Sequence, residues 1–63
     1  MNMAPEEMKR IRRHLGLTQR QLAEALKLGA DGGRRIRRWE DGEIEISGPA
    51  AVAMKLMEEK HGP

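Results

Sequence analysis

The chain has 63 residues, of which 38% are hydrophobic and 35% charged, with a formal net charge of +2 and no cysteine. A chain this short builds one small core, and without cysteine it has neither disulfides nor thiolate metal sites. No apolar run approaches the roughly 20 residues that span a bilayer, and the polar, acidic N-terminus is unlike a signal peptide. We therefore expect a single domain over residues 1–63, in the cytoplasm and without a membrane partner.

The first predicted helix starts near Pro5, and His14 and Gly16 mark its C-terminus. Proline suits the first helical position, and Gly16 favours the left-handed conformation that ends many helices. Apolar residues at helical spacing predict its buried stripe: Met8, Ile11 and Leu15.

The second predicted helix spans about residues 18–27. Thr18 is a good N-cap, and Gln21 three residues later completes a capping box. Three apolar residues form its predicted buried face: Leu22, Ala23 and Leu26.

The third predicted helix spans about residues 31–41, with Asp31 or Gly29 as its N-cap and Gly42 as its stop signal. At about 100° per residue, Ile36 and Trp39 share one face of this helix. That face is expected to turn toward the core.

Four arginines lie away from this face. Arg34 and Arg38 point the opposite way, one turn apart, and Arg35 and Arg37 lie on the two flanks. Arginine forks onto guanine O6 and N7 and onto phosphate oxygens, and a single helix fits the DNA major groove. These four arginines therefore predict DNA binding, and the alternative is a charged helix face that contacts only water.

The fourth predicted helix spans about residues 48–59, after Ser47 and with Pro49 in its first turn. Its predicted apolar stripe contains four residues: Val52, Ala53, Leu56 and Met57. No segment alternates apolar and polar residues over a strand's length. The sequence therefore predicts an all-α fold, a compact bundle of four or five short helices.

Two motifs stand in a specific order: Gly-Leu-Thr-Gln-x-x-Leu-Ala at residues 16–23 and Ile-x-x-Trp-Glu-x-Gly at residues 36–42. Their order and spacing resemble the helix-turn-helix family of phage repressor and Cro-type (XRE-like) transcriptional regulators. The resemblance covers about residues 6–57. It implies a lambda-repressor-like DNA-binding domain whose third helix is the recognition helix and enters the major groove.

The resemblance also implies roles for individual residues. Arg34 and Arg38 match positions that read base edges, although either could instead contact phosphate. Arg12 and Glu40 match a salt bridge between the first and third helices, which would satisfy a carboxylate on the core side. Phosphate contacts are expected from six residues: Arg12, Thr18, Gln19, Arg20, Arg35 and Arg37.

Two segments depart from the family pattern. The turn Gly29–Gly33 is about three residues longer than usual, so it either extends the third helix or stays loose until DNA binds. Gly33 also stands where relatives place a base-reading side chain. The acidic loop Glu43–Glu45 replaces residues that are often basic, and we expect it to face away from DNA.

We expect a sequence-specific regulator of transcription that binds double-stranded DNA as a homodimer. The dimer would repress by covering a palindromic operator on the nucleoid. Autorepression of its own operon is expected, as in phage or mobile-element regulators such as the anti-CRISPR-associated ones. Four residues form the predicted dimer surface, or else complete the monomer core: Ile44, Ile46, Met54 and Met57.

Two other functions are compatible with the sequence. One is an antitoxin-like or adaptor module that binds a partner protein through the fourth helix, and the other is nonspecific binding of DNA or RNA. With His14 and His61 as the only histidines and no cysteine, we expect no catalytic site, metal, cofactor or small-molecule ligand.

Overall fold

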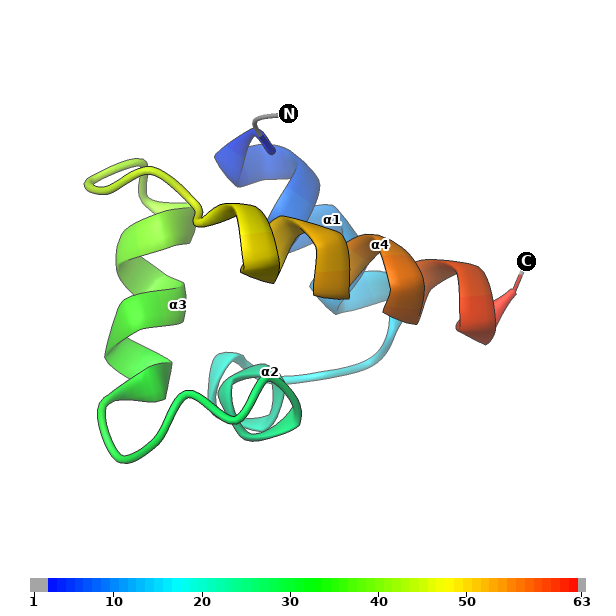
Figure 1. Ribbon diagram of the computed structural model, residues 1–63, viewed down its shortest axis with the longest axis horizontal. Helices are drawn as coiled ribbons and strands as arrows, with labels where there is room; N and C mark the ends of the chain where they lie inside the picture. Colours follow the sequence, from blue (N-terminus) through cyan, green and yellow to red (C-terminus); the bar gives the residue numbers. More distant parts are fainter. Residues whose placement is uncertain (1–2, 63) are drawn as a thin grey trace.

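The computed structural model describes residues 3–62, which form four helices and no strand. The helices are α1 (Pro5–His14), α2 (Gln19–Ala25), α3 (Gly32–Glu40) and α4 (Gly48–His61). They form a body of 29 × 24 × 17 Å in which α3 packs most extensively on α2, and α4 lies across α1 (Figure 1). The predicted all-α bundle of short helices is confirmed. No helix in residues 3–62 is long and apolar enough to cross a membrane.

Polar side chains cap two of the helix starts. The capping box of α2 is complete, because the Gln21 amide donates to Thr18 Oγ1 (3.0 Å) and the Thr18 amide donates to Gln21 Oε1 (2.9 Å). At α4, the Ala50 amide donates to Ser47 Oγ (3.3 Å). Asp31 occupies the N-cap of α3 as predicted, but its side chain accepts no capping hydrogen bond.

Left-handed residues follow the first three helices. Gly16 (φ 73°) and Gly42 (φ 79°) take this conformation after α1 and α3, as their positions predicted. After α2 it is Lys27 (φ 58°), while the Leu28 amide donates to the Ala23 carbonyl (3.1 Å). This hydrogen-bond pattern is a Schellman motif. The motif ends α2 at residue 25 rather than at the predicted residue 27. The sequence did not indicate this end, because lysine, unlike glycine, does not favour the left-handed conformation.

The core lies where the four helices meet. Its fully buried large side chains come from every helix: Met8, Ile11, Leu22, Ile36 and Met54. Trp39 is also buried, as predicted. Leu15 and Leu26, expected in the core, are only partly buried at its edge.

Helix α4 turns a different face to the core from the one predicted. The predicted stripe is wrong at Val52 and Leu56, whose residues are 61% and 50% exposed. Three other residues face the core instead: Ala50, Ala51 and Met54. Because α4 carries apolar residues around most of its circumference, periodicity did not determine its buried side. The helix also runs two residues beyond the predicted residue 59.

Two residues expected on a dimer surface lie in the monomer core. Ile46 and Met54 are buried, so they are unavailable to a second copy. Ile46 closes the core where the chain enters α4, which is the alternative that the sequence left open. Met57 is partly buried against the core, and Ile44 is exposed.

Two ion pairs fasten α4 to α1. The Lys55 ammonium donates to the Glu7 carboxylate, and Arg10 Nη1 donates to Glu58 Oε2 at 3.0 Å. The hydrogen bond from Lys55 lowers the pKa of Glu7, and the same bond raises the pKa of Lys55. The charged forms of this pair therefore help to hold the two helices together.

Candidate nucleic-acid interface

Close packing of α3 on α2 sets the direction of the arginine face. Gly32, at the start of α3, is buried against α2, and a Cβ there would lie 2.7 Å from Ala23 Cβ and 2.8 Å from Leu28 Cβ. Only glycine allows this approach. The contact presses the Ile36 side of α3 inward and leaves its other side in solvent.

All four arginines of α3 are exposed. Arg34 and Arg38 lie opposite the buried Ile36, and Arg35 and Arg37 lie on the two flanks of the helix. The angular arrangement expected from the sequence is therefore present in the structure. The result is a ridge of guanidinium groups on a short helix, which we call the arginine face.

Two carboxylates partly neutralise one end of the arginine face. Arg37 Nε lies 3.7 Å from Asp41 Oδ2, and Arg38 Nε lies 3.7 Å from Glu43 Oε1. The expectation that the acidic loop faces away is wrong for Glu43. The turn at Gly42 folds the chain back, so that the Glu43 amide donates to the Arg38 carbonyl (2.9 Å).

Shallow hollows lie between the arginine side chains. One, of about 260 Å³, is bordered by Arg34, Arg35 and Arg38, with Asp31 and Ile44 at its edges. A second, of about 300 Å³, lies beside Arg37 and ends at Glu43. Both are open and lined largely by arginine, as suits oxygen acceptors that approach from outside.

A buried carboxylate joins three helices behind the arginine face. Glu40 is 5% exposed, and its oxygens accept from Arg12 Nε (2.7 Å), Arg12 Nη2 (3.1 Å) and Gln19 Nε2 (3.2 Å). The structure thus contains the ion pair that the resemblance implied between α1 and α3. Among the described residues, no buried polar side-chain atom lacks a hydrogen-bond partner.

These contacts bear on the phosphate contacts expected near α2. Arg12 also donates to the Leu17 carbonyl (3.0 Å), so three of its five N–H groups serve the fold and its side chain is 12% exposed. Gln19 is half-buried, and one of its amide N–H groups holds Glu40. Thr18 and Arg20 are exposed. The bond from Gln19 to Glu40 was missed, because a glutamine at a helix start gives no signal of its long-range partner.

The long turn between α2 and α3 lies outside both helices, since α3 begins only at Gly32. The Gly32 amide donates to the Gly29 carbonyl (3.1 Å), and Gly29 takes a left-handed conformation (φ 84°). The turn thus has a defined path, and its ordering by DNA stays a prediction. A Cβ on Gly33 would meet only Arg20 Cα, at 3.9 Å, so this position has room for a side chain that the chain does not use.

No protein-family model, curated protein or solved structure matches the chain. Residues 3–62 also hold no group of three or more histidine, aspartate or glutamate side chains placed to bind a metal ion. The arginine face and the Glu40 carboxylate behind it are the features of the described residues that bear on function.

Proposed function

We propose that this protein binds double-stranded DNA in a sequence-specific manner and regulates transcription. The observation that carries the proposal is the arginine face: four exposed guanidinium groups on one side of α3, opposite its buried residues. A helix of this kind fits the major groove, where arginine recognises guanine by two hydrogen bonds. A face that contacted only water would gain nothing from arginine in particular.

The packing of α2 and α3 supports the same function. Gly32 and the Glu40 network fix the position of α3 on the core by close packing and hydrogen bonds, as a base-reading helix requires. The sequence motifs at residues 16–23 and 36–42, which α2 and α3 carry in part, resemble those of phage repressor and Cro-type helix-turn-helix regulators. On this proposal Arg34 and Arg38 read bases, and Arg35 and Arg37 grip the flanking phosphates.

Two copies on an inverted repeat would complete the site. One short helix reads only a few base pairs, and regulators of this kind bind two half-sites about 34 Å apart. Such a dimer represses by covering a promoter. The most specific part of the proposal is that the protein represses its own operon, in the manner of a phage or mobile-element regulator. The sequence resemblance alone supports this part.

Selection from a pool of randomised duplex DNA tests the proposal. The purified protein should enrich an inverted repeat that contains guanines in each half-site. Its affinity for this repeat should fall steeply as the salt concentration is raised. The double variant Arg34→Ala/Arg38→Ala is the matched control, because it keeps the fold and should enrich no such repeat. Binding without enrichment would leave a nonspecific binder, and absence of binding at low salt would refute DNA binding.

A further inference from the structure

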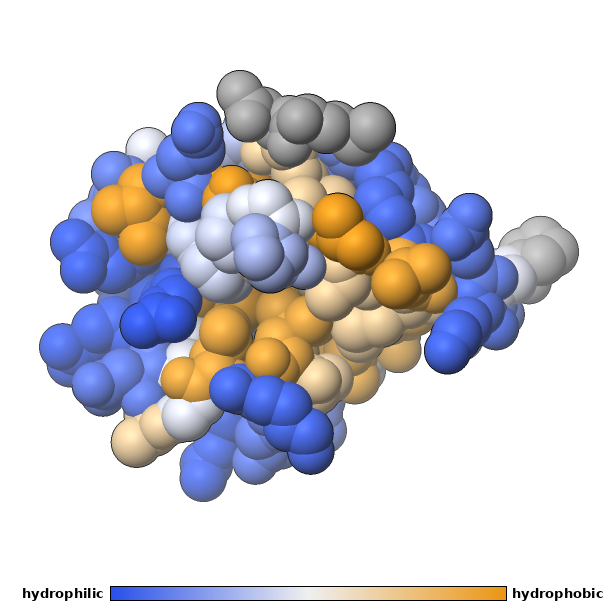
Figure 2. Space-filling view, in the orientation of Figure 1, coloured by the Kyte–Doolittle hydropathy of each residue, from blue (hydrophilic) through white to orange (hydrophobic). Residues whose placement is uncertain are grey.

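An acidic residue, Asp31, borders the arginine face. It lines the hollow of about 260 Å³ together with three arginines of α3: Arg34, Arg35 and Arg38. These positions are three, four and seven residues further along the chain, a spacing that places side chains on one side of a helix. Figure 2 shows mostly hydrophilic colour at the left of the view, where α3 lies. A carboxylate and several guanidinium groups therefore share one polar surface.

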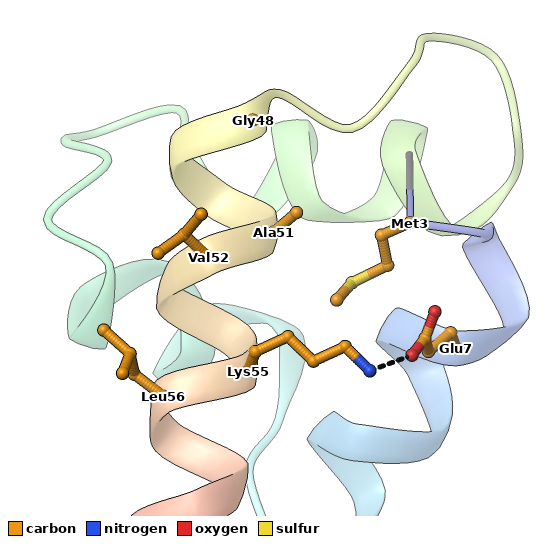
Figure 3. Close-up of a pocket in the computed structure, with 7 residues that line it drawn as sticks. All are labelled: Met3, Glu7, Gly48, Ala51, Val52, Lys55 and Leu56. Atoms are coloured by element: carbon orange, nitrogen blue, oxygen red, sulfur yellow. Dashed lines mark hydrogen bonds and ion pairs between the residues drawn. The ribbon is translucent and has the colours of Figure 1, made fainter. Parts of the chain in front are cut away.

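The Asp31 carboxylate has no partner within the described part of the chain. Aspartate at an N-cap ordinarily accepts a hydrogen bond from the first turn, but this exposed side chain accepts none. It also makes no ion pair with the arginines beside it. Other carboxylates are paired: Figure 3 shows Lys55 reaching Glu7, and at the far end of α3 Asp41 and Glu43 each lie 3.7 Å from an arginine.

DNA offers a carboxylate on this surface few favourable partners. Phosphate oxygens repel it, and so do the hydrogen-bond acceptors of guanine (O6 and N7) and thymine (O4). Only the amino groups of cytosine and adenine donate hydrogen bonds into the major groove. Adenine also carries the acceptor N7 beside its amino group, and asparagine or glutamine matches that pair better. The base that best suits an aspartate is therefore cytosine.

We infer that Asp31 selects a cytosine in each half-site by accepting a hydrogen bond from its N4 amino group. This assignment rests on the proposed function, because it gives a base to the helix that enters the major groove. Residues three apart, such as Asp31 and Arg34, are separated by about 4.5 Å along a helix axis, and successive base pairs by about 3.4 Å. We therefore expect the cytosine in the base pair of the Arg34 guanine or in the pair next to it.

The mixture of charges on this surface supports the assignment. In a G·C pair, the acceptors of guanine and the amino donor of cytosine lie side by side in the major groove. Arg34 and Asp31 offer the matching donors and acceptor within one turn of the chain. A surface of arginine alone binds phosphate in any register, whereas a carboxylate penalises every register that puts no amino group opposite it. Asp31 thus raises specificity by weakening the wrong complexes.

Selection from randomised duplex DNA with Asp31→Ala tests the inference. The variant should fold like the parent chain, because the side chain is exposed and caps nothing. The preference for cytosine at one position of each half-site should disappear, and the ratio of operator affinity to scrambled-duplex affinity should fall about tenfold. The matched control is Asp41→Ala, which removes the same charge at the other end of α3. This control should bind every duplex at least as tightly as the parent and select the same bases.

A modified base identifies the group that Asp31 contacts. N4-methylcytosine still pairs with guanine, but a methyl group replaces the amino hydrogen that points into the major groove. Placed at the assigned position of the operator, it should weaken binding of the parent chain about tenfold and leave binding of Asp31→Ala unchanged. Arg34→Ala should stay sensitive to the methyl group, because Arg34 contacts guanine. Equal weakening of the parent and of Asp31→Ala would overturn the inference.

Other outcomes separate this inference from the proposed function. If Asp31→Ala selects the same sequence as the parent, the inference is overturned and the proposed function stands. A uniform gain in affinity on all duplexes also overturns it, because the carboxylate then only repels phosphate. Loss of the guanine preference without sensitivity to N4-methylation would make Asp31 a positioning partner of Arg34 and not a reader of cytosine. A parent chain that enriches no sequence refutes the proposed function, and the role of Asp31 falls with it.

Discussion

Helices α3 and α4 pack on the same core, but α3 exposes charged side chains to solvent and α4 exposes apolar ones. On α3 the buried side holds Ile36 and Trp39, and the exposed side is arginine. On α4 the buried side is built from alanine and Met54, and the exposed side still carries Val52 and Leu56. A sharp contrast between the two sides lets the sequence alone orient a helix, whereas an evenly apolar helix is oriented by its neighbours.

The largest expected loss of stability comes from replacing Glu40, the charged residue that α3 buries. Glu40→Ala leaves the Arg12 guanidinium, 12% exposed, without its carboxylate. Breaking a buried ion pair costs about 3–5 kcal/mol, a large part of the stability of a chain this small. Urea unfolding should show this loss as a lower midpoint.

The matched control for this loss replaces both partners. Arg12→Met/Glu40→Met should recover much of the stability, because no charge is then left buried without a partner. If Glu40→Ala unfolds like the parent chain, the carboxylate does not hold the three helices together.

The second prediction concerns the close packing of Gly32 that orients α3 against α2. Gly32→Ala places a methyl group 2.7 Å from Ala23 Cβ and 2.8 Å from Leu28 Cβ, so the helices must separate. We expect a loss of about 1–3 kcal/mol in the free energy of unfolding. Gly33→Ala is the control, since its nearest neighbour lies at 3.9 Å, and it should be neutral or stabilising by up to about 1 kcal/mol. Equal effects of the two variants would contradict the close approach.

The third prediction separates the centre of the arginine face from its flanks. On the selected operator, Arg34→Ala or Arg38→Ala should cost about 1–3 kcal/mol of binding and relax the preference for one base pair. Arg35→Ala and Arg37→Ala should weaken binding equally on all sequences and reduce the salt slope by about one. Titrations on operator and scrambled duplexes distinguish these outcomes, and uniform losses for all four variants would exclude base reading.

The smallest effect concerns the attachment of α4. Because the folded-state pKa of Glu7 lies below its ordinary 4.5, the pair with Lys55 stabilises the fold above that pH, and the contribution is lost as pH falls through the lowered value. Because the pKa of Lys55 is raised above 10.5, the contribution is also lost as pH rises through the raised value. Glu7→Gln should therefore lower Tm slightly at pH 7 and not in strong acid. A difference in Tm that persists at low pH would exclude the ion pair as its cause.

Most of the first three helices could be predicted from the sequence. Glycines after α1 and α3, and the capping box of α2, signal helix ends through local backbone chemistry. Among the long-range contacts, only the ion pair of Arg12 with Glu40 was implied in advance, by the family resemblance. Other contacts between segments gave no such signal. The bond from Gln19 to Glu40, the pairing of Arg38 with Glu43 and the inward turn of Ile46 depend on how separate segments meet.

The carboxylates beside Arg37 and Arg38 act as internal competitors for the anions of DNA. On the proposed function, Glu43 beside Arg38 reduces the positive potential that attracts phosphate, because the two side chains form an exposed ion pair at 3.7 Å. A guanine edge instead offers two acceptors in the geometry of the guanidinium fork. Asp41 and Glu43 would thus depress affinity for random duplex more than affinity for the operator, and discrimination would improve at the expense of overall strength.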